Sequence, residues 1–208
     1  MVNLHVTTHP LLAHKVTYLR DEKTSPKEFR RLLEEITQLL VFDCTRDLVT
    51  HPITITTPMK TIQSPVLQDQ IVIVPILRAG LGMESSIQQL IPTAKVAHVG
   101  MYRDPITHKP TMYYQKFPQG LHQFEAIIVD PLLATGGSVI ETIKLLKNSN
   151  IRKIRVVSII GVMEGVNAIH EQFPDVSIFL AALDPVLNEN KYIEPGLGDA
   201  GDRLFGTK

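Results

Sequence analysis

Short runs of valine and isoleucine recur along the last two thirds of the chain, and they constrain its fold more than any other feature. Stretches near residues 71–75, 125–130 and 154–160 contain few polar side chains. A strand with one face in water alternates apolar and polar residues, whereas these stretches are apolar on both faces. They predict strands buried on both sides, the environment of a parallel sheet covered by helices.

Segments of helical character separate these runs, so strand and helix alternate from residue 71 onward. We expect further strands near 95–100 and 176–182, and helices near 82–90, 138–147 and 164–172. This order predicts an α/β fold with a doubly wound, mostly parallel sheet flanked by helices. With no internal repeat or linker, residues 1–208 are expected to form a single domain. Its small hood is expected to come from the N-terminal segment and residues 184–208.

The residues before 71 and the segment 105–120 give weaker signals. Ser25-Pro26-Lys27-Glu28 has the residue types that open a helix, and apolar residues then recur at helical spacing. Residues 9–21 are expected to wrap on the body as a short segment, and 50–57 to form an edge strand. Residues 105–120 hold three prolines. They predict a long hairpin or β-arm that either covers a ligand or contacts a second subunit.

Composition argues against several classes of protein. The 208 residues carry 21 basic and 21 acidic side chains, without the excess charge typical of nucleic-acid or membrane-surface binding. No apolar run approaches the roughly 20 residues that span a bilayer, and the N-terminus lacks a signal-peptide pattern. Cys44 is the single cysteine, which is consistent with a cytoplasmic protein. We expect this thiol to be buried or half-buried and inert, and the histidines show no metal-binding spacing.

Residues 126–138 combine an apolar strand, an acid at its end and a loop of small residues that enters a helix. Asp130 ends the strand, and the loop then runs through Ala134, Thr135, Gly136, Gly137 and Ser138. Small side chains let several backbone N–H groups point into one space, where the helix N-terminus adds positive potential. Such a loop suits a phosphorylated sugar, whose hydroxyl groups the acid would bind. The alternative is an ordinary strand–helix turn in which Ser138 caps the helix.

Two arginines follow other predicted strands. Arg78 comes after the run at 71–75, within a loop that also contains Gly80 and Gly82, and Arg103 comes after the strand at 95–100. Ligands of open α/β sheets bind at the carboxyl ends of the strands, and arginine donates charge-assisted hydrogen bonds to phosphate groups. Arg78 is therefore a candidate for binding a diphosphate. The alternative for Arg78 is a surface charge at a strand end.

The C-terminal segment, residues 192–207, contains four glycines and a proline. Glycine permits positive φ or close approach of the backbone to a ligand, although an Ω-loop packed on the core would also account for this composition. The segment closely resembles the uracil-binding signature of the uracil phosphoribosyltransferases, and residues 130–138 resemble the phosphoribosyl-diphosphate motif of phosphoribosyltransferases in general. Uracil presents two carbonyl acceptors beside an N–H donor, a pattern that backbone groups can recognise.

The resemblance covers nearly the whole chain and implies transfer of 5-phosphoribosyl from 5-phospho-α-D-ribose 1-diphosphate to N1 of uracil, giving UMP and diphosphate. It implies catalytic roles for Arg78, Arg103 and Asp130. The donor-binding residues that it implies are Arg78, Arg103, Asp130, Pro131, Leu132, Leu133, Ala134, Thr135, Gly136, Gly137, Ser138 and Asp199. The uracil-binding residues that it implies are Ile193, Gly198, Asp199 and Ala200.

The same resemblance implies partners and a cofactor. Mg²⁺ would arrive with the diphosphate of the donor rather than occupy a dedicated protein site. GTP activates some relatives and is a candidate effector here. A homodimer or a higher homo-oligomer is expected, and no nucleic-acid or membrane partner is.

Three features depart from the family pattern. Pro131 occupies a position where many phosphoribosyltransferases have a second acid, which favours uracil over a purine or orotate. Lys191 stands where we expect glycine, so it is expected to restrict the backbone φ or change the mobility of the hood. Residues 161–165 read Gly-Val-Met-Glu-Gly in place of Ala-Ala-Pro-Glu-Gly, which we expect to shift packing near the ribose more than the chemistry.

Two other functions remain open from the sequence. A regulator that binds RNA and senses uridine nucleotides would need a basic concave face, which the neutral charge balance disfavours. A phosphoribosyltransferase for another base would be separated by a panel of substrates.

Overall fold

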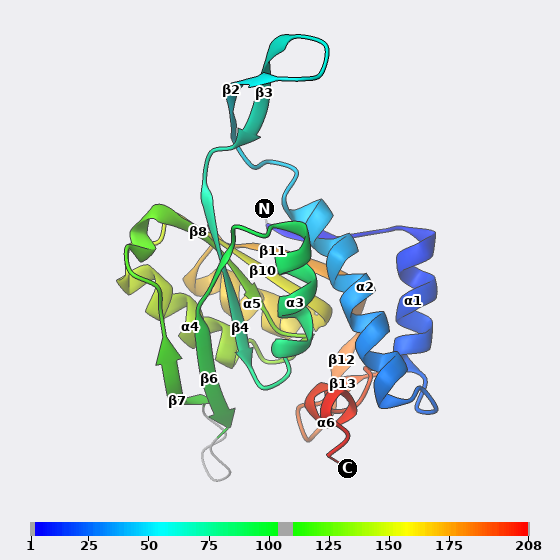
Figure 1. Cartoon of the computed structure of the whole chain (residues 1–208). Helices are drawn as coiled ribbons and strands as arrows, with labels where there is room; N and C mark the ends of the chain where they lie inside the picture. The colour runs from blue at the N-terminus through cyan, green and yellow to red at the C-terminus, as the bar shows by residue number, and fades with distance from the viewer. Residues whose placement is uncertain (1–2, 104–109, 208) are drawn as a thin grey trace.

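The computed structural model describes residues 3–103 and 110–207, and the side chains of Arg103 and Pro110 lie outside the described part. A central sheet organises the chain (Figure 1). From one edge to the other its strands are β1 (Leu4–Val6), β11 (Ser177–Asp184), β10 (Lys153–Val162), β8 (Phe124–Val129), β4 (Gln70–Leu77), β6 (His98–Arg103) and β7 (Pro110–Lys116). The short strands β5 (Lys95–Val96) and β9 (Leu132–Leu133) pair with β4 and β10. Within the described residues every pair in this sheet is parallel except β6–β7.

Helices cover both faces of the sheet. One face carries α1 (Pro10–Arg20), α2 (Pro26–Cys44) and α3 (Leu81–Leu90), while the other carries α4 (Gly137–Asn148) and α5 (Met163–Gln172). The C-terminal part adds the pair β12 (Val186–Leu187) and β13 (Ile193–Glu194), then helix α6 (Ala200–Phe205), beside the end of α1. A 3₁₀ turn, η1 (Leu121–Gln123), precedes β8. No helix in the described ranges is both long and apolar enough to cross a membrane.

Alternate residues of the central strands enter two separate cores. In β4, Ile71 and Ile73 pack with the α1–α3 side, whereas Val72 and Val74 pack with the α4–α5 side. Successive side chains of a strand point to opposite faces, so a continuous apolar run is what a sheet covered on both sides requires. The predicted fold class, a mostly parallel sheet flanked by helices, is confirmed.

One charged residue interrupts these buried runs. Arg155, in β10, is 1% exposed, and its guanidinium donates to Glu125 Oε2 at 2.6 Å and to Asp47 Oδ1 at 2.7 Å. A buried arginine needs such partners because an unpaired charge in the interior is strongly destabilising. The pairing explains how β10 tolerates a charge in an otherwise apolar stretch.

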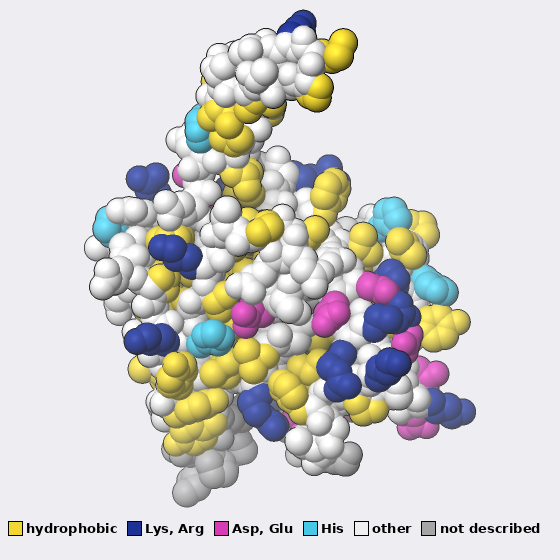
Figure 2. Space-filling model, in the orientation of Figure 1, with side chains coloured by type: hydrophobic (Ala, Val, Ile, Leu, Met, Phe, Trp, Pro, Cys, Tyr) yellow, Lys and Arg dark blue, Asp and Glu magenta, His cyan; other side chains and the backbone are white. Residues whose placement is uncertain are grey.

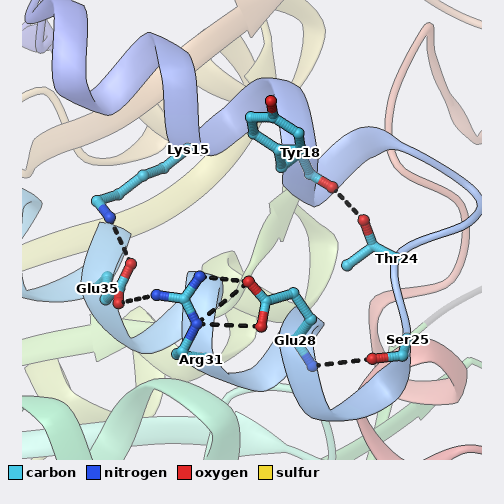
Figure 3. Close-up of polar contacts among 7 residues, drawn as sticks. All are labelled: Lys15, Tyr18, Thr24, Ser25, Glu28, Arg31 and Glu35. Carbon is cyan, nitrogen blue, oxygen red and sulfur yellow. Dashed lines mark hydrogen bonds and ion pairs between the residues drawn. The ribbon is translucent and has the colours of Figure 1, made fainter.

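Ser25 caps the N-terminus of α2 as predicted, while the carboxylate of Glu28, the other capping residue, binds an arginine. Ser25 Oγ accepts a hydrogen bond from the Glu28 backbone N–H at 3.3 Å. The Glu28 carboxylate pairs with Arg31, which also reaches Glu35, and Glu35 in turn binds Lys15 of α1 (Figure 3). The capping acid therefore takes part in a surface ion-pair series that connects α2 to α1.

Two N-terminal segments have more regular structure than was predicted. Residues 10–20 pack on the body as expected, and they do so as a regular helix, because Leu12, Val16 and Leu19 fall on one face and are buried. The expected edge strand at 50–57 is β2 (Thr50–Thr56), but it pairs with β3 (Thr61–Leu67), which was not predicted. The β2–β3 hairpin extends away from the body (Figure 1). Its polar, mostly exposed strands give little of the hydrophobic signal by which strands are recognised in a sequence.

The segment 105–120 was predicted to form a long hairpin or arm. Its described part contains β7, which pairs antiparallel with β6 and so forms a hairpin. Residues 104–109 lie outside the described residues, and the part of the prediction that concerns them stays a prediction.

Candidate active site

The loop after β8 forms a small pocket at the carboxyl edge of the sheet. Asp130 follows the last residue of β8, and α4 begins at Gly137. A cavity of about 90 Å³ is lined by Asp130 and by residues 132–139. The Pro131 carbonyl accepts hydrogen bonds from the backbone N–H groups of Ile159 and Ile160 at 3.0 and 3.1 Å. The loop is therefore fixed to β10 on one side while its small residues face the cavity.

This loop packs against α5 through a close backbone contact. A Cβ atom at Gly165 would lie 2.2 Å from the Ala134 carbonyl oxygen, far inside the contact distance. Gly136, the N-cap of α4, has φ +77° and would place a Cβ atom 2.9 Å from the Gly165 carbonyl oxygen. Glycine at both positions is what allows α5 and the loop to approach each other.

Asp130 has an unusual electrostatic environment. Burial and, to a lesser extent, the negative charge of Asp199 together raise the pKa of this half-buried carboxyl to about 7. The backbone N–H of Leu132 opposes the shift through a long hydrogen bond of 3.5 Å to Oδ1. An acid with such a pKa at the mouth of a pocket is typical of a functional site.

The C-terminal segment brings a second acid and the predicted arginine to the same edge. Asp199 is the N-cap of α6 and accepts a hydrogen bond from the Asp202 backbone N–H at 2.9 Å. Arg78, after the end of β4, lies with Nη2 3.6 Å from Asp202 Oδ1 and with its guanidinium 5.9 Å from the centre of the Phe205 ring. The loop after β4, the loop after β8 and the C-terminal segment thus meet.

Two of the four predicted uracil-binding residues have buried side chains. Ile193 and Ala200 are buried, and both side chains belong to the core on the α1–α3 side. Gly198 is exposed and has φ +78°, a left-handed conformation. The side chains of Ile193 and Ala200 are therefore not available to contact a ligand.

Three other residues were singled out in the sequence: Arg103, Lys191 and Cys44. Arg103 is the last residue of β6, but its side chain lies outside the described residues. Lys191 has φ +62°, so the backbone conformation is one that glycine would adopt without strain, and its Nζ lies 3.5 Å from Glu164 Oε1 at the start of α5. Burial raises the pKa of the Cys44 thiol to about 12, and the prediction of a buried thiol is confirmed.

Sequence reasoning missed residues that shape the site from a distance. Gly165 was noted only as part of a segment that departs from the family pattern, although it supports the loop at 134–138. Arg20 and Asp184 form a bidentate ion pair beneath the C-terminal segment. They are 164 residues apart in the sequence, and nothing in the local pattern of either residue indicates the pairing.

Comparison with known proteins identifies the family. A family model described as uracil phosphoribosyltransferase matches residues 6–207. The chain is 51% identical to the uracil phosphoribosyltransferases of Bacillus licheniformis and Lysinibacillus sphaericus, over 209 positions that cover 100% of both chains in each comparison. The chain belongs to the uracil phosphoribosyltransferase family.

Solved structures agree with this membership. The structure of the AQ2163 protein from Aquifex aeolicus is 35% identical, has a TM-score of 0.95 and matches 99% of either chain. An adenine phosphoribosyl transferase from Trypanosoma brucei, solved with AMP, pyrophosphate and ribose-5-phosphate, has a TM-score of 0.61 at 12% identity. That match covers 96% of this chain and 89% of the other and shows a common fold. The resemblance of this uracil phosphoribosyltransferase family member to phosphoribosyltransferases, first seen in its motifs, is thus confirmed.

Asp130→Asn is expected to stabilise the unliganded protein at pH 8. Above pH 4 the unfolded chain ionises this carboxyl freely, whereas the folded protein keeps it protonated up to about pH 7. Because only the unfolded chain releases this proton between these pH values, the free energy of unfolding falls progressively as the pH rises from 4 to 7. The interval sets an upper limit of about 4 kcal/mol, which partial solvent access reduces to about 2 kcal/mol.

The measurement is the melting temperature of wild type and variant from pH 4 to pH 8. The gain should be largest at pH 8 and vanish near pH 4. Glu171→Gln, which removes an exposed carboxylate on α5, serves as the control. A gain that is constant over this range would mean that the Asp130 carboxyl does not titrate as described.

Proposed function

We propose that this protein transfers the 5-phosphoribosyl group from 5-phospho-α-D-ribose 1-diphosphate to N1 of uracil, giving UMP and diphosphate. One observation carries the proposal: in a member of the uracil phosphoribosyltransferase family, the loops after β4 and β8 and the C-terminal segment converge at the carboxyl edge of the sheet. In open α/β sheets this edge is where ligands bind.

The loop after β8 binds the phosphoribosyl part of the donor. Residues 131–138 surround the small cavity, and the N-terminus of α4 points its dipole toward it, an arrangement suited to the 5′-phosphate. Asp130 accepts hydrogen bonds from the ribose hydroxyl groups. Binding at both places fixes C1 of the ribose relative to the base, which removes much of the entropic barrier to reaction.

Arginines stabilise the leaving group. The bond between C1 and the diphosphate oxygen breaks as the bond between C1 and uracil N1 forms, and N1 loses its proton to water. Negative charge therefore grows on the departing diphosphate. Arg78 lies at the edge where the diphosphate would be, and Arg103, at the end of β6, is assigned the same task. Donors aimed at developing charge commonly contribute several kcal/mol to transition-state stabilisation.

The C-terminal segment reads the base. The backbone groups of Ile193 and of Gly198, Asp199 and Ala200 face uracil, because two of these side chains are committed to the core. Asp199 also approaches the ribose of the donor. Recognition through the backbone requires that this segment keep one conformation.

Magnesium fits the donor set at this edge. Asp130 is half-buried and feels the negative charge of Asp199, and oxygen ligands of this kind suit a hard divalent cation. When bound, Mg²⁺ neutralises charge on the diphosphate. It would be held mainly by oxygens of the diphosphate and by water, with at most one protein carboxylate, that of Asp130 or Asp199.

A second copy of the chain is the partner proposed for the β2–β3 hairpin. Its exposed apolar side chains include Ile53, Ile55 and Met59, and Met59 is 90% exposed. Hydrophobic side chains are visible on the projecting hairpin in Figure 2. An isolated two-stranded hairpin is marginally stable in water, and exposed apolar clusters typically mark contact surfaces. We therefore propose a homodimer or a higher homo-oligomer, with GTP as a candidate effector.

The purified protein, given Mg²⁺, phosphoribosyl diphosphate and one base at a time, is expected to form UMP from uracil and no nucleotide from orotate, hypoxanthine or guanine. Chromatography of the products measures this, with and without GTP. Arg78→Ala should lower kcat/KM by about 100-fold or more, the usual cost of losing a donor to developing charge. The matched control is Arg46→Ala, an exposed arginine beside the amino ends of β10 and β11.

Product from a different base would reassign the substrate within the phosphoribosyltransferases. Absence of product from every base, together with RNA binding that added salt abolishes, would favour the regulator instead. Equal losses in Arg78→Ala and Arg46→Ala would remove Arg78 from the site.

Met59→Asp is expected to weaken the proposed assembly, since it places a charge within an apolar contact. Size-exclusion chromatography with light scattering, over a range of protein concentrations, measures the mass. Wild type should show at least the dimer mass, and the variant a larger monomer fraction at low concentration. Lys23→Asp, a change to an exposed residue between α1 and α2, is the control and should leave the mass unchanged. A wild type that is monomeric at every concentration would contradict the proposal.

A further inference from the structure

The turn at Gly196 lies within the segment that is proposed to bind uracil. Both backbone polar groups of Gly196, its N–H and its carbonyl, are hydrogen-bonded to side chains. The Gly196 backbone N–H donates to Asp184 Oδ2 at 2.9 Å, and its carbonyl accepts from Arg20 Nη1 at 2.7 Å. Gly196 is buried, and its φ is +58°. A Cβ atom there would lie 2.1 Å from the Ile193 carbonyl oxygen, so the turn is tight as well as fully bonded.

Arg20 and Asp184 also bind each other through two hydrogen bonds. Arg20 Nη1 donates to Asp184 Oδ2 at 2.8 Å, and Nη2 donates to Oδ1 at 2.6 Å. The Asp184 side chain is 6% exposed and that of Arg20 is 22% exposed. A bidentate pair of this kind fixes the orientation of both side chains, and two of its atoms, Arg20 Nη1 and Asp184 Oδ2, also bind Gly196.

A second arginine holds the next residue of the turn. Arg203 Nη1 donates to the Leu197 carbonyl at 3.0 Å and to the Leu19 carbonyl at 2.7 Å. Its guanidinium also lies 4.5 Å from the centre of the Phe29 ring. The C-terminal end of α1 is thus connected to the turn through Arg20 and, by way of its last carbonyls, through Arg203.

These contacts have a consequence for recognition of the base. Ile193, Gly198 and Ala200 would read uracil through backbone groups, which have no side-chain freedom with which to correct a displaced segment. A shift of about 1 Å in such a hydrogen-bonding group is enough to lose the bond. Gly196 and Leu197 lie between Ile193 and Gly198, so holding them sets the spacing of the two halves of the reading segment.

We propose that Arg20, together with Asp184, is a positioning residue for uracil: it holds the Gly196 turn and thereby sets the affinity for the base without touching it. This inference rests on the proposed function. The helix α1 thus contributes to base recognition from outside the site. The donor, bound by the loop after β8, should be insensitive to the same residues.

The test measures kcat and the two KM values for Arg20→Ala, Arg20→Lys and wild type. Arg20→Ala should raise the KM for uracil by about tenfold or more, as expected for losing charge-assisted hydrogen bonds. The KM for phosphoribosyl diphosphate should change by less than about twofold. Arg20→Lys keeps the positive charge but not the paired donors of the guanidinium. Its KM for uracil should therefore lie between those of wild type and Arg20→Ala.

Arg30→Ala is the matched control, because Arg30 Nη1 also donates to a backbone carbonyl of the C-terminal segment, that of Leu204, at 2.7 Å. Leu204 follows the proposed reading residues, so this variant should lose similar stability with little change in the uracil KM. If Arg20→Ala does not fold, Arg20→Lys and the nearly isosteric Asp184→Asn decide by the same split.

A uracil KM that stays within about twofold of wild type in folded Arg20 or Asp184 variants would overturn the inference. Equal increases in both KM values, or an equal effect of Arg30→Ala, would do so too, since they would indicate general loosening of the hood. A wild type that forms no UMP would instead overturn the proposed function, and the two failures are therefore distinguishable.

Discussion

The close backbone approach between α5 and the loop after β8 is the constraint on which the candidate site depends. Gly165 lies so near the Ala134 carbonyl that no side chain fits there, and Gly136 meets Gly165 from the other side. This contact sets where the loop ends and α4 begins. It therefore determines where the N-terminus of α4 points and how large the cavity beside Asp130 is. If the loop after β8 were displaced, the loop after β4 and the C-terminal segment would no longer meet it at the carboxyl edge of the sheet.

The site gathers negative charge at some cost in stability. Asp130 and Asp199 are close enough that the second raises the pKa of the first, and burial adds to this effect. An acid protonated near neutral pH in the free protein has a clear use if the ligand brings a cation. A donor that carries Mg²⁺ would relieve the repulsion when it binds, and positive charge that develops on the ribose would do the same. In this view the unfavourable electrostatics of the empty site become favourable binding energy for the correct ligand.

The sequence predicted those parts of the molecule in which local pattern and final structure coincide. The runs around Ile73, Ile127 and Val157 had to be strands of a covered sheet, because both faces are apolar. Small residues after Asp130 predicted the loop, and Ser25 predicted the start of α2. The residue that replaces an expected glycine, Lys191, adopts the positive φ that glycine would have taken.

Other parts could not be predicted because they depend on contacts between distant residues. β3 mixes polar and apolar side chains without a clear pattern and is a strand because it pairs with β2. The Arg20–Asp184 pair joins the end of α1 to the end of β11, and neither residue has a neighbour that indicates the other. The raised pKa of Asp130 likewise follows from burial and from the position of Asp199, which only the folded chain brings near.

The central claim is that the carboxyl edge of the sheet binds the phosphoribosyl donor between these three segments. A crystal structure with Mg²⁺ and phosphoribosyl diphosphate tests it most directly. The 5′-phosphate should lie within hydrogen-bonding distance, about 3 Å, of backbone N–H groups between Thr135 and Ser138, with Asp130 at the ribose hydroxyls and Arg78 beside the diphosphate. A donor bound at another part of the chain, with the loop after β8 empty, would contradict the account.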